Sequence, residues 1–232
     1  MADLMSNSDF IMLLFANTGF YYVVAGIQYW CVNYMQQVLH ASYATATLYF
    51  AFTAFFAPLT GVLFGGALIS YYGGYNSRRS REILLIMGWA CTAFAIPVPI
   101  VDNFTSFGIL IFGLLFCGAS LLPSLTGIML NCVPDHQRAS ANSLAQVSYN
   151  LFGWMPAPFV YGLVSQIAGD SQVLGDKEKS RVPLAFIIYS EVFTLALMTI
   201  VILRKLRTEN LENQLLKAEV LFQKQQEGDE ES

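Results

Sequence analysis

Long apolar runs with few charged residues dominate the sequence. They occupy six ranges: 10–32, 48–72, 83–101, 104–130, 139–168 and 182–203. Each is long enough to cross a hydrocarbon core of about 30 Å, which takes about 20 helical residues. The runs are continuous rather than alternating, so we expect helices and not the strands of a membrane barrel. The pattern predicts an all-α membrane protein with six transmembrane helices.

Composition supports a membrane location. The 232 residues are 55% hydrophobic and 12% charged, which leaves too little charge to cover an ordinary soluble domain. Many of the acidic residues that produce the net charge of -4 lie in residues 209–232, and the remainder of the chain is close to neutral. We therefore expect no nucleic-acid partner. The four cysteines have neither CxxC spacing nor a neighbouring histidine, so we expect no metal site and no cofactor.

Lysine and arginine residues in the loops predict the orientation. Arg78, Arg79 and Arg81 follow the second run, Arg138 precedes the fifth, and Arg204, Lys205 and Arg207 follow the sixth. Basic loops stay in the cytoplasm, so both termini should be cytoplasmic. We therefore divide the chain into a cytoplasmic N-terminal segment (1–9), a transmembrane domain (10–204) and a cytoplasmic tail that is helical and acidic (205–232).

Several runs contain residues that are unusual in lipid. Asn17, Tyr21 and Gln28 recur at roughly helical spacing in the first run, so they should face protein or water, either as helix-to-helix hydrogen bonds or as the lining of a cavity. Glu191, the acidic side chain deepest within a run, is a functional candidate, with a structural hydrogen bond as the alternative. Proline interrupts the second run at Pro58 and the fifth at Pro156 and Pro158.

Two loop segments resemble signatures of the major facilitator superfamily. Residues 66–74 are similar to its GxLxDRxGR signature: Gly66 and Gly73 match, but Ser70 stands in place of the acid. The sequence around Pro134, Asp135 and Arg138 is similar to its P[ED]xxRxxA loop. The resemblance implies the C-terminal six-helix half of a facilitator, built as a 3+3 inverted repeat, with these loops as gating elements. Within the superfamily, residues 132–162 resemble spinster-type transporters of sphingolipids and lysolipids.

The resemblance implies a function and a missing partner. A facilitator needs two six-helix halves, so the second half must come from the same gene product, a homodimer or another subunit. The expected function is transport of a small amphipathic organic solute or lipid by alternating access, with Glu191 as the coupling candidate. The expected binding residues are Asn17, Tyr21, Gln28, Asn142, Gln146, Tyr149 and Asn150. Interhelical packing is the alternative role for these polar residues.

A different class of function also fits the sequence. A facilitator half that has lost transport could serve as a structural or adaptor subunit of a membrane assembly. The altered signature at Ser70 and Tyr71 favours this alternative, and so does a narrow apolar seam on the otherwise polar tail, which could dock a partner helix. We do not expect an enzyme, because no pair of carboxylates, nucleophile with a base, or phosphate-binding loop is evident.

Overall fold

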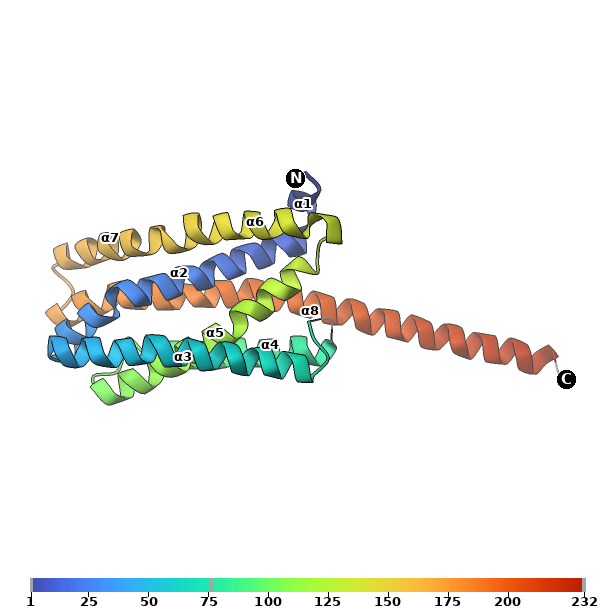
Figure 1. The fold of residues 1–232 in the computed structure, drawn as a ribbon, viewed down its shortest axis with the longest axis horizontal. Coiled ribbons are helices and arrows are strands. Elements are labelled where there is room, and N and C mark those ends of the chain that lie inside the picture. Colours follow the sequence, from blue (N-terminus) through green and yellow to red (C-terminus); the bar gives the residue numbers. More distant parts are fainter. Residues whose placement is uncertain (1, 76, 231–232) are drawn as a thin grey trace.

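The computed structural model describes residues 2–75 and 77–230, and within these residues the regular elements are all helices (Figure 1). The chain starts with the short α1 (Ala2–Ser6). The long helices that follow lie side by side along one axis (Figure 1). They are α2 (Ser8–Gln37), α3 (Tyr43–Tyr71), α4 (Arg78–Ala95), α5 (Phe104–Leu130), α6 (Arg138–Ser148), α7 (Pro156–Asp170) and α8 (Asp176–Glu230). The prediction of an all-helical protein is confirmed.

Among the described residues, α2, α3, α5 and part of α8 are long and apolar enough to cross a membrane. Their ends follow from local capping. The Asn7 side chain accepts a hydrogen bond from the Phe10 backbone at 3.1 Å and starts α2, and Ser42 caps α3 in the same way. The helix α5 has the predicted bounds, with Asn103 as its cap. Hydropathy therefore located these helices, and the caps set their ends.

The other two predicted spans differ in form. The third helix ends at Ala95, and residues 96–100 form turns, because Pro97 and Pro99 cannot donate the backbone hydrogen bonds that would continue it. The fifth run is divided into α6, the π-helical segment η2 (Tyr149–Trp154) and α7. The backbone N–H of Met155 donates to the Asn150 carbonyl at 3.1 Å, which is the wider π spacing.

The helix α2 is the centre of the bundle. It packs against α8, η2, α5, α7 and α3, and its Phe10, Leu13 and Ile27 side chains are fully buried. In contrast, α3 contacts mainly α5. Only 28% of its most apolar 18-residue stretch is buried. Most of the α3 surface is thus free to meet lipid or another protein.

Glycine lets α3 and α5 approach closely, as the Gly61 and Gly65 spacing indicates. A Cβ atom on Gly65 would lie 2.5 Å from the Ser120 carbonyl oxygen, and one on Gly61 would overlap the Phe116 carbonyl. The end of α3 also needs glycine: Gly73 and Gly74 have φ of 95° and 78°, a region that other residues rarely adopt.

Several connections lie together at one end of the bundle. One end of the bundle gathers α1, the α3–α4 turn, the 3-10 helix η1 (Asp135–Gln137) and the point where α8 leaves the bundle (Figure 1). These are the segments predicted to be cytoplasmic, and the side of the membrane that they face stays a prediction. The helix α8 runs without a break through the predicted boundary between residues 204 and 205, and Arg81 pairs with Glu209 beyond it.

Candidate functional site

The structure separates the predicted binding residues into three places. Asn17, Tyr21 and Tyr149 meet between α2 and η2. Asn142, Gln146 and Asn150 share the exposed face of α6 and η2. Gln28 lies apart from both groups and lines a cavity deeper in the bundle. The predicted set is therefore not one continuous surface within the described residues.

A buried polar network joins α2, α5 and η2. Asn17 is fully buried, and its Nδ2 donates to the Tyr149 hydroxyl at 3.0 Å and to Thr126 Oγ1 at 3.1 Å. Thr126 in turn donates to the Leu122 carbonyl of its own helix at 2.9 Å. Thr126 was not among the predicted binding residues, because its pairing with Asn17 depends on how the helices pack. Asn17 Oδ1 has no partner among the described residues, so the network keeps one free acceptor.

Aromatic rings extend this network. Tyr21 stacks on Tyr149 with ring centroids 4.6 Å apart, and Trp154 lies 6.5 Å from Tyr21. The π-helical segment places both Tyr149 and Trp154 toward α2. It also brings Gly153 so close that a Cβ atom there would be 2.9 Å from the Thr18 carbonyl oxygen. In the sequence, only the prolines that follow this segment mark its position.

The amides of the α6–η2 face remain open. Asn142, Gln146 and Asn150 are exposed, and Asn150 Nδ2 donates to the Gln146 carbonyl at 2.7 Å. Gln146 and Asn150 line a shallow groove together with Val147, Leu151 and Met155. Polar side chains of a membrane helix are costly in contact with lipid, so this face should meet water or protein.

A partly open cavity of about 170 Å³ lies between α2, α3, α4, α5 and α8. Apolar side chains form most of its lining, and Gln28 and Glu191 bring polar groups to it. The Glu191 side chain is 1% exposed. Thr92 donates to Glu191 Oε1 at a long 3.4 Å, and Oε2 has no hydrogen-bond partner among the described residues.

The predicted helix-breaking prolines have different settings. Pro58 lies inside α3 and lines the cavity, whereas Pro156 and Pro158 fall in the first turn of α7, directly after η2. Prolines also occur inside α5 at Pro123 and inside α8 at Pro183. Prolines inside helices are therefore not confined to the second and fifth runs.

The two signature loops lie at the same end of the bundle. Gly66 and Ser70 are on the last turns of α3, and Gly73 ends that helix. Pro134 precedes η1, and Arg138 pairs with Asp135 at 3.0 Å in an exposed ion pair. The altered first signature lacks its acid at Ser70, but the neighbouring Arg81 is buried and pairs with Glu209 of α8.

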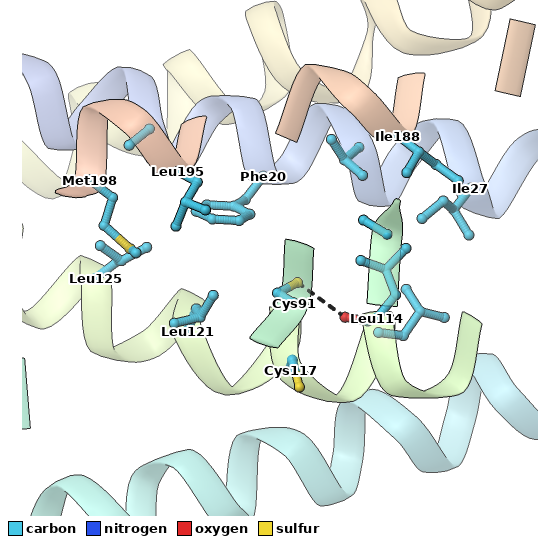
Figure 2. Packing of buried hydrophobic residues seen from close by; sticks show 14 of the residues in the cluster. Phe20, Ile27, Cys91, Leu114, Cys117, Leu121, Leu125, Ile188, Leu195 and Met198 are labelled. Carbon is cyan, nitrogen blue, oxygen red and sulfur yellow. Dashed lines mark hydrogen bonds between the residues drawn. The ribbon is translucent and has the colours of Figure 1, made fainter. Parts of the chain in front are cut away.

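Potential metal ligands and cysteines are scattered through the described residues. They contain no cluster of three or more His, Cys, Asp or Glu side chains that could hold a metal ion, and their four cysteines are free. Three of these cysteines are buried among apolar neighbours. Cys91, for example, donates its thiol to the Leu114 carbonyl at 3.5 Å, between side chains of α2, α5 and α8 (Figure 2).

Comparison with known proteins gives one positive result. A comparison with curated proteins found none that matches this chain. The family model described as Major Facilitator Superfamily matches residues 6–226, from just before α2 to well beyond the predicted end of the sixth span. Because this match covers nearly the whole sequence, the chain belongs to the Major Facilitator Superfamily.

Proposed function

We propose that this major facilitator-type transporter moves a small amphipathic organic solute or lipid, and that it acts by alternating access together with a second six-helix unit. Family membership establishes an integral membrane protein of the transporter type. The substrate class, the half-length architecture and the second unit are the proposal. The observation that carries it is the open amide face formed by Asn142, Gln146 and Asn150.

The amide face supports a second unit because this chain leaves it uncovered. Gln146 and Asn150 lie in a segment whose other exposed residues, such as Leu151 and Phe152, are apolar. Lipid would satisfy those apolar residues but not the amides. A second unit with a water-filled path between the two would satisfy both, and the three sources of that unit remain the same gene product, a second copy and another subunit.

The packing of the helices supports a 3+3 inverted repeat. In such a repeat α2 corresponds to α5, α3 to the segment from α6 to α7, and α4 to α8. The contact of α2 with α8 then corresponds to that of α5 with α4, and both contacts occur. The contact of α3 with α5 likewise corresponds to that of η2 and α7 with α2.

The side chains support a substrate that is largely apolar. The aromatic rings of Tyr21 and Trp154 are partly exposed, and they pack beside the buried pair of Asn17 and Tyr149. These groups are all uncharged. Pockets of this kind bind apolar ligands and orient them with a few polar contacts. This chemistry suits a lysolipid or sphingolipid, which agrees with the spinster-like sequence of residues 132–162.

In this proposal the signature loops act as gating elements on the cytoplasmic side. Pro134, Asp135 and Arg138 shape the entry to α6, while Gly66, Ser70 and Gly73 shape the end of α3. Both termini would be cytoplasmic, since α1 and the emerging part of α8 lie at the same end as these loops (Figure 1). Glu191 is the candidate group for coupling transport to protons.

The alternative function is that of an adaptor subunit. One observation favours it: α8 is 55 residues long and extends far out of the bundle, where it could dock a partner (Figure 1). Purification in a mild, non-denaturing detergent separates the two ideas. A homodimer supports the transporter, whereas a stable complex with other proteins and no transport supports the adaptor.

Transport is best tested in proteoliposomes with a fluorescent lysolipid whose external pool can be quenched. The double variant Gln146→Leu with Asn150→Leu should reduce the transport rate at least about tenfold, because it removes the amide contacts of the substrate path. Ser143→Leu is the matched control, because Ser143 is an exposed polar residue of α6 that donates to the Ala139 carbonyl of its own helix.

Equal transport by the double variant and the control would remove the amide face from the mechanism. The same assay at several pH values tests Glu191, which faces Cys91 and Thr92 of α4. Glu191→Gln should flatten the pH dependence of transport, and an unchanged pH profile would return Glu191 to a structural role.

A further inference from the structure

We propose that the cavity beside Glu191 is a binding site for a small apolar molecule that carries a protonated amine, such as a benzylamine-sized ligand. The site is built from this chain alone, so the proposal stands whether or not the transport function is correct. It goes beyond the amide face, because the cavity is lined by α2, α3, α4, α5 and α8, and none of Asn142, Gln146, Asn150, Asn17 and Tyr149 lines it.

The size of the cavity selects a small ligand. Its volume is about 170 Å³, and an apolar cavity of about 150 Å³ is enough to take up benzene. Phe20 and Ile27 of α2 and Leu114 of α5 contribute to its walls, and Figure 2 shows these side chains around Cys91. One aromatic ring with a short polar group would fill this space.

The walls favour an apolar body for the ligand. Val23, Val24, Leu115 and Leu122 add further aliphatic surface, and Gly118 leaves room beside the Cys91 sulfur. Water would find few hydrogen-bond partners on such walls, so a ligand that displaces it gains the apolar contact area.

Glu191 determines which polar group the ligand should carry. Its side chain lines the cavity and is 1% exposed, yet Oε2 is unpartnered among the described residues. No ion pair of the described residues includes Glu191. A buried carboxyl group with one unpartnered oxygen is costly, and an ammonium group would supply both an opposite charge and hydrogen-bond donors. An anionic ligand would instead be repelled.

Gln28 gives the ligand a second polar contact and a route inward. It lines the cavity but is itself exposed on α2, so it marks where the cavity meets the surface. Its amide oxygen can accept a hydrogen bond from the ligand on entry. Pro58 and Ala54 of α3 line the cavity as well, and α3 is the least buried of the spanning helices.

Binding of radiolabelled benzylamine to the purified full chain in detergent tests the proposal. We expect saturable binding, and competition by the neutral isostere benzyl alcohol should be at least about tenfold weaker, since it lacks the charge. Glu191→Gln should weaken benzylamine binding at least about tenfold for the same reason. Ala54→Phe should also weaken it, by filling the cavity.

Ala51→Phe is the control for the cavity-filling variant, because Ala51 is exposed on the same helix and does not line the cavity. It should bind benzylamine as the unmodified chain does. Absence of saturable binding by the unmodified chain overturns the proposal. So does equal competition by benzyl alcohol, or full binding by a folded Ala54→Phe variant. The benzyl alcohol comparison needs no variant, so the test holds even if Glu191→Gln fails to fold.

Discussion

Two interfaces of the bundle are built by different means: that of α3 with α5, and that of α2 with the α6–α7 segment. The proposed 3+3 repeat would make them counterparts of each other. Between α3 and α5, glycine brings backbones into contact, as at Gly65 and Ser120. Between α2 and η2, polar and aromatic side chains meet, as in the Asn17–Tyr149 hydrogen bond and the Tyr21–Tyr149 stack. The first interface is typical of permanent packing in membranes. The second keeps polar groups and a π-helical segment in place, which is typical of functional sites.

The largest effect should come from the glycine interface. Gly65→Ala places a Cβ atom 2.5 Å from the Ser120 carbonyl oxygen, where backbone must move. We expect a loss of stability of about 1–3 kcal/mol, measured by thermal unfolding in detergent. Gly66→Ala is the matched control, because a Cβ atom at Gly66 meets nothing within 4 Å among the described residues. If the two variants unfold alike, close packing at Gly65 is not what holds α3 to α5.

A smaller effect is expected in the polar interface. Tyr149→Phe removes the hydroxyl that accepts from Asn17 at 3.0 Å, while the Asn17–Thr126 bond remains. Interhelical hydrogen bonds in membranes contribute about 0.6 kcal/mol on average, so unfolding should shift only slightly. The loss of transport rate should be larger than this small loss of stability would cause. The exposed Tyr43 supplies the control, and a Tyr149→Phe variant with the stability and transport of Tyr43→Phe would mean that the network has no special role.

The smallest effect belongs to an ion cluster outside both interfaces. Asp102 pairs with Lys177 and Arg181 of α8. The hydrogen bond from Lys177, followed by the charge of Arg181, lowers the pKa of Asp102. Because the folded-state pKa is lowered, the cluster stabilises the protein above the unfolded pKa of about 3.9. That stability is lost as the pH falls through the lower folded-state value.

Asp102→Asn should therefore lower the unfolding temperature slightly at neutral pH, and this difference should vanish in acid. Thermal unfolding of both proteins at several pH values measures it. A difference that persists at low pH would show that Asp102 acts through its shape or packing rather than its charge.

The sequence predicted the helices better than the site. Hydropathy placed α5 at its observed bounds and the centres of α2 and α3 within a few residues. It failed at Pro97, where turns replace the end of the third run, and at η2, whose form depends on the fit of Gly153 against α2.

Polar residues inside the helices could be identified from the sequence, but their partners on other helices could not. Spacing along one helix identified Asn17, Tyr21 and Gln28, but helical spacing is only approximate over three turns. The structure turns Gln28 toward the Glu191 cavity and Asn17 toward Tyr149. Thr126 and Trp154 joined the network only through packing between helices, which no single segment of the sequence specifies.

The central claim is that the amide face of α6 and η2 lines a water-filled substrate path. Cysteine labelling in intact membranes tests it most directly, in a background where the partly exposed Cys132 is replaced by alanine. We predict that Gln146→Cys reacts readily with a charged, membrane-impermeant thiol reagent, while Leu63→Cys, on the exposed apolar face of α3, does not. Equal protection of both positions would contradict the account, because the amide face would then be covered by lipid or closed protein.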